Sequence, residues 1–152
     1  MSKSRLLIAD PIHQDAIELL KSAGLEVIIQ PEISHKELIE IIGDFDAIIV
    51  RSRTKVTREV IEAGKRLKVV ARSGVGLDNV DKLAAKEHGI SVVNSPEGPS
   101  VSVAELVFAL ALSIVRKVSF ADQGMREGKW LKKECKGSEL RGHIIGIVGF
   151  GL

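Results

Sequence analysis

The fold is decided by the stretch DAIIVRSRTKVTREVIEAGKRLKVVARSGVGLDNVD, residues 46–81. Two short apolar runs, at 46–50 and 67–71, flank a segment at 57–64 that has the pattern of a short helix and ends in a glycine. An apolar run without polar alternation is typical of a strand that is covered on both faces of its sheet. The stretch therefore predicts two strands joined by a helix, which is the repeating unit of a parallel sheet.

The same alternation of strand and helix continues along the chain on both sides of this stretch. Ser34 and Glu37 have the spacing of a capping box at the start of one helix, and Gly24 suits the left-handed end of another. Right-handed crossovers would place helices on both faces of the sheet, so we expect an α/β fold with a flavodoxin-like parallel sheet over residues 1–94. The further strands are expected at 5–10, 25–30 and 90–94, and the further helices at 14–24, 34–42 and 79–89.

The pattern is interrupted at NSPEGPS, residues 94–100, which is the best candidate for a boundary. Ser102 and Glu105 then repeat the spacing of a capping box, and the helix expected at 102–118 is apolar nearly all round. Such a helix should be buried on most sides, at an interface between domains or between subunits. A polar stretch at 116–143 and a strand at 144–149 are expected to follow.

The composition excludes several classes of protein. Lys and Arg number 22 against 20 Asp and Glu, a net charge of +2, so we expect no concentrated basic face for nucleic acid or a membrane surface. The longest apolar stretch, 103–115, is shorter than the about 20 residues of a membrane span, and no signal peptide is visible. One cysteine, Cys135, permits no internal disulfide and fits a reducing, cytoplasmic setting. None of the four histidines has a second ligand at metal spacing, so no metal site is expected.

Two neighbouring loops of the predicted sheet carry polar and glycine residues. In open parallel sheets, ligands bind outside the carboxyl ends of the strands. The arginines at these ends could offer planar forks to a carboxylate or phosphate, and the glycines could turn a backbone N–H toward an anion. The alternative stays open that the arginines are solvated and the glycines only make a tight turn. The loop residues are Arg51, Ser52 and Arg53 after one strand, and Arg72, Ser73, Gly74, Val75 and Gly76 after the next.

The last residues, GFG after the apolar run at 144–149, have the form of half a dinucleotide-binding turn. Gly149 and Gly151 would be its first two glycines, one for the tight turn and one for close approach of a pyrophosphate. The third glycine, the following helix and the acidic residue that completes the fingerprint are absent from the sequence. By itself this motif is a weak indication of a nucleotide.

The stretch 46–81, together with GISVVNSPEGPSVSVAEL (89–106) and GKWLKKECKGSELRGHIIGIVGFG (128–151), resembles the D-isomer-specific 2-hydroxyacid dehydrogenases. The similarity is greatest to those members that oxidise D-3-phosphoglycerate with NAD. It implies a flavodoxin-like substrate domain at 1–94 and the start of a Rossmann domain at 95–152, cut after its first strand. It further implies a homodimer through the helix at 102–118.

The resemblance also implies roles for particular residues. Substrate contacts would come from Arg51, Ser52, Arg72, Ser73, Gly74 and Val75, and NAD contacts from Val75, Gly149 and Gly151. The catalytic Arg, Glu and His of the family would lie beyond residue 152, so the 152-residue chain alone is expected to be inactive. Pro99 stands where the family often has an asparagine that can reach the substrate, which puts a contact there in doubt.

Other functions remain to be weighed against this one. Another D-2-hydroxyacid dehydrogenase, of the glyoxylate or hydroxypyruvate reductase type, would share the same loops, as would a non-enzymatic relative that senses NAD. A signalling receiver is also flavodoxin-like, but it requires an aspartate where the strand at 46–50 is followed by Arg51. The choice between NAD and NADP rests on the resemblance alone.

Overall fold

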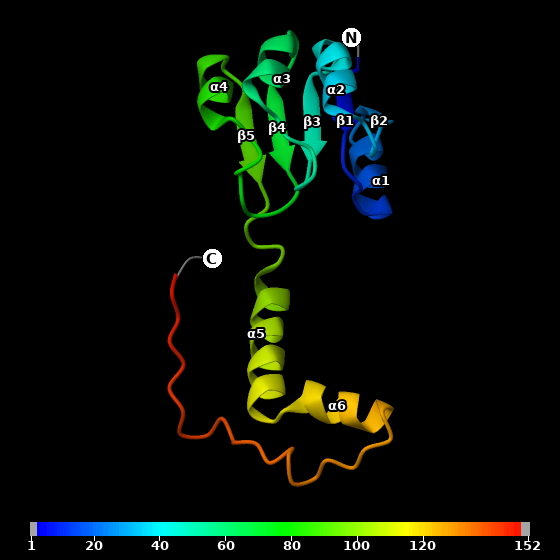
Figure 1. Ribbon diagram of the computed structural model, residues 1–152. Helices are drawn as coiled ribbons and strands as arrows, with labels where there is room; N and C mark the ends of the chain where they lie inside the picture. The colour runs from blue at the N-terminus through cyan, green and yellow to red at the C-terminus, as the bar shows by residue number, and fades with distance from the viewer. Residues whose placement is uncertain (1–2, 150–152) are drawn as a thin grey trace. The chain divides into compact units, whose positions relative to one another are not determined.

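The computed structural model describes residues 3–149 and divides into two compact units, one ending at Gly98 and the other beginning at Pro99. The division falls inside the predicted boundary segment at 94–100. In the first unit, strands and helices alternate as the sequence predicts, with ends that are shorter by a few residues (Figure 1). They are β1 (Arg5–Ile8), α1 (Gln14–Ser22), β2 (Glu26–Ile29), α2 (His35–Ile41), the 3-10 turn η1 (Ile42–Asp44), β3 (Ala47–Val50), α3 (Arg58–Ala63), β4 (Val69–Arg72), α4 (Lys82–Glu87) and β5 (Ser91–Asn94).

All five strands pair in parallel in the order β2-β1-β3-β4-β5, which Figure 1 shows side by side. This is the flavodoxin-like order, so the predicted α/β fold class is confirmed. The chain steps from β1 outward to β2, and then in the opposite direction through β3, β4 and β5. Because each crossover is right-handed, α1 lies on one face of the sheet and α2, α3 and α4 lie on the other.

The two faces of the sheet are covered to different degrees. On the face of α2, α3 and α4, the helices pack against one another and bury alternate strand residues. On the other face, Leu6 and Ile8 are buried on the side of α1, where Ile17 is also buried. Toward β5 this face is more open, since Val93 is 49% exposed. The expectation of cover on both faces is therefore met only in part within the described residues. The core includes Leu7, Leu38, Ile48, Val50, Val60, Ile61, Val70 and Ala84.

The second unit consists of two helices and irregular chain. Helix α5 (Ser100–Val115) begins two residues earlier than predicted, with Pro99 as its N-cap, and Val103 N donates to Pro99 O at 2.9 Å. The predicted capping box at Ser102 and Glu105 is wrong, because both residues lie inside the helix. A proline has a fixed φ that suits a helix start, and this allows the helix to begin two residues before Ser102.

The prediction that this helix is buried on most sides is not met. None of the residues of α5 is buried, and its apolar side chains are largely exposed, as Val101 (70%) and Leu106 (56%) show. A helix can bury all of its sides only against other elements, and in the described part of the chain α5 packs chiefly against α6 (Val118–Arg126). The apolar pattern correctly predicted a helix here, but it did not predict how exposed that helix is in the described chain.

Two further expectations for this unit are wrong. The helix expected to reach 118 ends at Val115, because Lys117 adopts a left-handed conformation with φ of +53°, and α6 begins directly after it, within the polar stretch at 116–143. Residues 144–149, expected as a strand, form none. A strand is held by hydrogen bonds to a neighbour, and no strand of the described chain pairs with this run.

Candidate functional site

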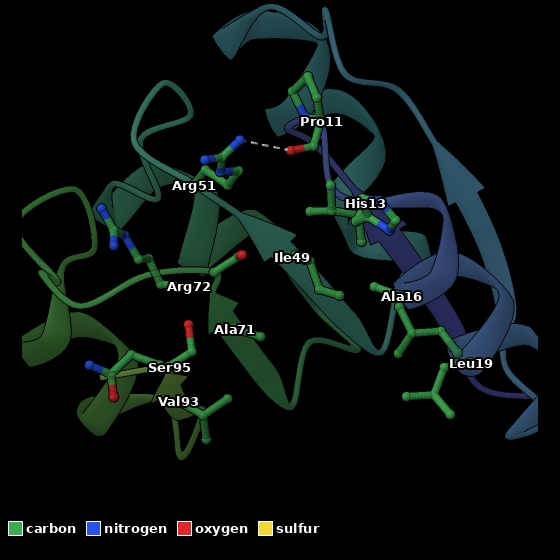
Figure 2. A pocket seen from close by; sticks show the side chains of 14 residues that line it. Pro11, His13, Ala16, Leu19, Ile49, Arg51, Ala71, Arg72, Val93 and Ser95 are labelled. Atoms are coloured by element: carbon green, nitrogen blue, oxygen red, sulfur yellow. Dashed lines mark hydrogen bonds between the residues drawn. The ribbon is translucent and has the colours of Figure 1, made fainter. Parts of the chain in front are cut away.

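A cleft in the first unit has a volume of about 840 Å³ and lies beside α1, across β3, β4 and β5 toward their carboxyl ends. Figure 2 shows the side chains that line it. The position agrees with the general rule for ligands of open parallel sheets. The lining residues are Pro11, Ile12, His13, Ala16, Leu19, Leu20, Ile49, Arg51, Ala71, Arg72, Ser73, Val93, Asn94 and Ser95.

The floor of the cleft is apolar. Ile49, Ala71 and Val93 are register partners across the three strands, so their side chains form a continuous row (Figure 2). Ala16 and Leu19 of α1 line the opposite wall. A concave, mostly apolar surface with a few polar groups at its edge is the usual form of a small-molecule site.

Two arginines at the rim carry guanidinium groups with few partners. Arg51 follows β3 and donates one side-chain hydrogen bond, from Nη1 to Pro11 O at 3.3 Å. Arg72 ends β4, and its Nε is buried without a hydrogen-bond partner among the residues that the structure describes. Figure 2 shows both side chains on the strand-end side of the cleft. A buried donor without a partner is unfavourable, so an anionic ligand would stabilise this arrangement.

The last residue of β4 and the three that follow it, residues 72–75, form a turn that is shaped by Gly74 and is called the 72–75 loop below. This glycine has φ of +141°, and a Cβ on it would overlap the Arg72 guanidinium, so the arginine lies where only a glycine leaves room. Its N–H donates to Ser95 Oγ at 2.8 Å, which joins this loop to the residue that follows β5. Asn94 Nδ2 donates to Val75 O at 2.7 Å and holds the loop from the end of β5.

The residues predicted to bind substrate are therefore only partly brought together. Arg51, Arg72 and Ser73 line the cleft, while Ser52, Gly74 and Val75 belong to the same two loops without lining it. Of the two glycines predicted to contact a nucleotide, Gly149 is described and has φ of +94°, whereas Gly151 lies outside the described residues.

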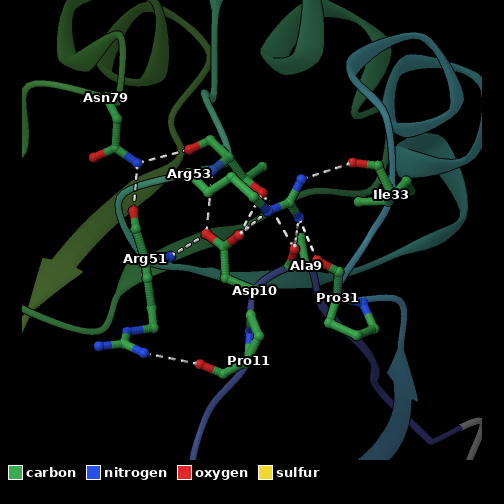
Figure 3. A network of polar contacts seen from close by, with 9 residues as sticks. Ala9, Asp10, Pro11, Pro31, Ile33, Arg51, Arg53 and Asn79 are labelled. Atoms are coloured by element: carbon green, nitrogen blue, oxygen red, sulfur yellow. Dashed lines mark hydrogen bonds and ion pairs between the residues drawn. The ribbon is translucent and has the colours of Figure 1, made fainter.

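The sequence analysis missed a polar network beneath the loop after β3, residues 51–54 (Figure 3). At its centre is Asp10, which is 1% exposed and forms an ion pair with Arg53, Oδ1 to Nε at 3.0 Å. Asn79 contacts the same loop from the other side. A signal for Asp10 was present, since an acidic residue directly follows a buried apolar strand and precedes a proline. The contact with Asn79 depends on tertiary structure and has no local signal.

Within residues 3–149, no group of three or more His, Cys, Asp or Glu side chains is placed to hold a metal ion. Over the same residues, no helix has both the length and the apolar character needed to cross a bilayer.

Known proteins are similar to this chain over most of its length. The family model of the D-isomer specific 2-hydroxyacid dehydrogenase catalytic domain matches residues 6–138. The D-3-phosphoglycerate dehydrogenase of Archaeoglobus fulgidus is 46% identical over 147 residues, which are 97% of this chain and 28% of that protein. The hydroxypyruvate reductase of Thermotoga maritima is 44% identical over 151 residues, 99% of this chain and 49% of that protein.

A solved structure is similar in fold to about three quarters of this chain. The 3-phosphoglycerate dehydrogenase of Entamoeba histolytica, determined with NAD+ bound, is 32% identical with a TM-score of 0.67, over 76% of this chain and 40% of that one. This chain thus spans less than half the length of each of the three relatives.

Proposed function

The chain belongs to the D-isomer specific 2-hydroxyacid dehydrogenases, and on that premise we propose that it is part of an NAD-dependent enzyme that oxidises D-3-phosphoglycerate to 3-phosphohydroxypyruvate, the first step of serine biosynthesis. The observation that carries the proposal is the pair of arginines on the rim of one cleft. Arg51 uses one side-chain donor and Arg72 has a buried Nε without a partner among the described residues.

The chemistry of this substrate suits the cleft. D-3-phosphoglycerate carries a carboxylate at one end of a short carbon chain and a phosphate at the other. Guanidinium groups bind both anions through paired N–H donors, and two arginines on neighbouring loops offer two such groups. The apolar floor at Ile49, Ala71 and Val93 would lie under the carbon chain.

We assign the remaining predicted residues to the same task. Ser73, on the cleft, would donate to a substrate oxygen, while Ser52 and Val75 would approach it from the two loops. Gly74 would act through its lack of a side chain, which leaves room for Arg72. Residues 1–94 would then be the substrate domain and residues 95–152 the start of the nucleotide domain.

Bound NAD would supply the acceptor for the hydride that leaves C2 of the substrate. In the described residues, two positions fit contacts to it. Val75 is 42% exposed beside Arg72, and Gly149 has a positive φ with no atom within 4 Å of its would-be Cβ, as a close backbone approach requires. The chain's own residues would bind and orient the substrate. The family resemblance implies an arginine that holds the substrate carboxylate and a histidine, oriented by a glutamate, that takes the hydroxyl proton, all beyond residue 152.

Hydroxypyruvate reduction is the second candidate. It is favoured by the 44% identity to the Thermotoga maritima hydroxypyruvate reductase and by Pro99, which has no side-chain donor for a phosphate. The product of that reaction is glycerate, which has the same carbon skeleton as phosphoglycerate but lacks the phosphate. The two candidates therefore differ in whether the cleft must recognise a second anion.

The deciding experiment uses the full-length protein with NAD or NADP and compares D-3-phosphoglycerate with D-glycerate. We expect kcat/KM to be at least about 100-fold higher for the phosphorylated acid, since a site whose arginine donors stay unpaired rejects a substrate that lacks the matching group. Arg72→Lys keeps the positive charge but loses the paired N–H donors of the guanidinium, so it should lower this preference for the phosphorylated acid. Arg72→Ala should lower it further. Equal use of both acids would contradict the phosphoglycerate assignment and favour the second candidate.

We further propose that the full-length protein is a homodimer through the helix predicted at 102–118. The apolar side chains of α5 support this, because Phe108 (59%), Leu110 (54%) and Leu112 (47%) are exposed in the described chain. Apolar surface of this extent on one helix is typical of an interface.

A further inference from the structure

The 51–54 loop, which carries Arg51, is held at both of its ends by two side chains that come from elsewhere in the fold. We propose that Asp10 and Asn79 are a pair of positioning residues that fix this loop and thereby direct Arg51 toward the substrate. The inference rests on the proposed function, because it takes Arg51 to be a substrate contact. Neither residue was among the predicted substrate contacts, and neither lines the cleft.

Asp10 holds the N–H groups of the loop. Its Oδ2 accepts from Arg51 N at 2.5 Å and from Thr54 N at 3.2 Å, and its Oδ1 accepts from Thr54 Oγ1 at 2.9 Å (Figure 3). The carboxylate is 1% exposed, so water cannot take over these bonds without a rearrangement. A buried carboxylate with several donors is a strong acceptor, and it sets the distance between the first and last residues of the loop.

Asn79 holds the carbonyl groups of the same two residues. Its Nδ2 donates to Arg51 O at 2.6 Å and to Thr54 O at 2.7 Å. The polarities are matched, because a carboxylate can only accept and faces the N–H groups, whereas the amide nitrogen donates and faces the carbonyls. Asp10→Asn would place an amide N–H donor against N–H donors of the loop, either its backbone or Arg53 Nε. Asn79→Asp would place a carboxylate oxygen against the two carbonyl oxygens.

Arg53 lies between Arg51 and Thr54 in the loop, and its guanidinium makes several contacts within the protein. Besides the ion pair with Asp10, its Nη2 donates to Ala9 O at 2.6 Å and to Pro31 O at 2.5 Å, and its Nη1 donates to Ile33 O at 3.2 Å. These contacts tie the loop to the ends of β1 and β2. We therefore assign Arg53 to the support of the loop, in contrast to Arg51, whose guanidinium makes one such bond.

Asn79 is itself fixed by the backbone. Val56 N donates to Asn79 O at 2.8 Å, Asp81 N donates to Val56 O at 2.9 Å, and Val56 and Val80 form an isolated parallel bridge. The segment that follows the 72–75 loop is thus joined to the segment that follows the 51–54 loop. As a result, the loops that carry Arg51 and Arg72 are held relative to each other.

The first arm of the test measures steady-state kinetics of the full-length protein with D-3-phosphoglycerate. Asp10→Asn and Asn79→Asp should each raise KM for the acid at least about tenfold with a smaller change in kcat, since a shift of a binding group by about 1 Å can cost up to about 100-fold. Asp44→Asn is the matched control, because that carboxylate is 76% exposed and lies before β3, at the opposite end of that strand from the 51–54 loop.

The second arm asks whether the effect passes through Arg51. In an Arg51→Ala background, Asn79→Asp and Asp10→Asn should cause no further rise in KM, because the group that they position is gone. Rises in KM that multiply in the double variants would overturn the inference, since they would mean that the two residues act on the fold in general.

The third arm measures amide hydrogen exchange and does not depend on activity. Exchange in a peptide covering 50–56 should become at least about tenfold faster in both variants, while a peptide covering β4 stays unchanged. Unchanged exchange at 50–56 would overturn the inference. Faster local exchange combined with an Arg51→Ala variant of normal KM would support the loop contacts and contradict the proposed role of Arg51 in substrate binding. If either Asp10→Asn or Asn79→Asp does not fold, the kinetics and hydrogen exchange of the other variant test the inference.

Discussion

At the scale of single residues, Gly74 affects both the backbone conformation of its loop and the position of Arg72 at the cleft. Its φ of +141° is rare for other residues, and the space that a side chain would take is occupied by the Arg72 guanidinium. The sequence pattern pointed to this glycine as part of an anion-binding turn. In the structure, the N–H of Gly74 donates to Ser95 Oγ. The absence of a side chain on Gly74 also leaves room for the Arg72 guanidinium.

We expect Gly74→Ala to destabilise the protein by about 1–3 kcal/mol and to raise KM for the substrate in the full-length enzyme, because the backbone is strained and Arg72 must move. Gly24→Ala is the matched control, since Gly24 also has a positive φ, +86°, but no atom lies within 4 Å of its would-be Cβ. Urea unfolding and substrate kinetics measure the two effects. A normal KM for Gly74→Ala would show that the position of Arg72 does not matter for binding.

Asp46 is the residue for which we expect a clear dependence of stability on pH. The N–H of Arg5, which donates to its carboxylate at 3.0 Å, lowers the pKa of Asp46 below its ordinary value, and Lys68 and Arg66 lower it further. In the unfolded chain this carboxyl has its ordinary pKa. Its contribution to stability is therefore fully present above that value and is lost as the pH falls through the lowered pKa.

We expect Asp46→Asn to be less stable than the parent at neutral pH and to lose less stability on acidification. The measurement is the midpoint of urea unfolding between about pH 7 and about pH 2. Asp44→Asn, which removes an exposed carboxylate beside the same strand, is the control and should follow the parent curve more closely. A variant with the full acid sensitivity of the parent would exclude Asp46 as a source of it.

At the scale of elements, the same sequence signature gave one correct and one wrong prediction. Ser34 and Glu37 form a complete capping box, in which Glu37 N donates to Ser34 Oγ at 3.3 Å and Ser34 N donates to Glu37 Oε2 at 2.9 Å. Ser102 and Glu105 have identical spacing but lie inside α5. A capping signature competes with continuation of the helix, and the residues before Ser102 could continue it.

Ser34→Ala should therefore destabilise the first unit by about 1 kcal/mol, because one donor at the start of α2 loses its partner. Ser34→Thr keeps a hydroxyl acceptor and should retain most of the stability. Ser102→Ala should change the free energy of unfolding much less, since this serine caps no helix. The three variants can be compared by urea unfolding, and equal losses for Ser34→Ala and Ser102→Ala would contradict the assignment of the cap.

At the scale of the whole molecule, the buried core lies entirely in the first unit. Among residues 3–149, every buried hydrophobic residue falls between Leu6 and Ile90, whereas α5 contains no buried residue. The buried core and most of the exposed large apolar side chains are thus located in different parts of the described chain. This separation leads to a prediction about fragments.

We expect a chain of residues 1–98 to unfold cooperatively in urea and to remain monomeric, because it contains the whole core cluster. The 152-residue chain should associate as its concentration rises, since it exposes the apolar side chains of α5. Size-exclusion chromatography with light scattering distinguishes the two. Replacing Leu106 and Leu110 with Lys should make the longer chain behave like the shorter one, and persistent association would place the contact outside α5.

By itself, the sequence determined the order and type of the elements of the first unit, the parallel sheet and the family. These depend on local periodicity, on glycine and serine at helix ends, and on the spacing of residues within long motifs, all of which are properties of short segments. It also placed Arg51 and Arg72 at neighbouring strand ends, because parallel topology brings carboxyl ends to one edge of a sheet.

Only the tertiary structure decided which of these residues meet and what holds them. The pairing of Asp10 with the 51–54 loop joins residues 41 positions apart, and Asn79 reaches back 28 positions to Arg51. Such contacts produce no periodic pattern in the sequence, because they depend on how the strands align in three dimensions. For the same reason the run at 144–149 could not be known from its apolar residues alone: a strand exists only where another strand offers its backbone for pairing.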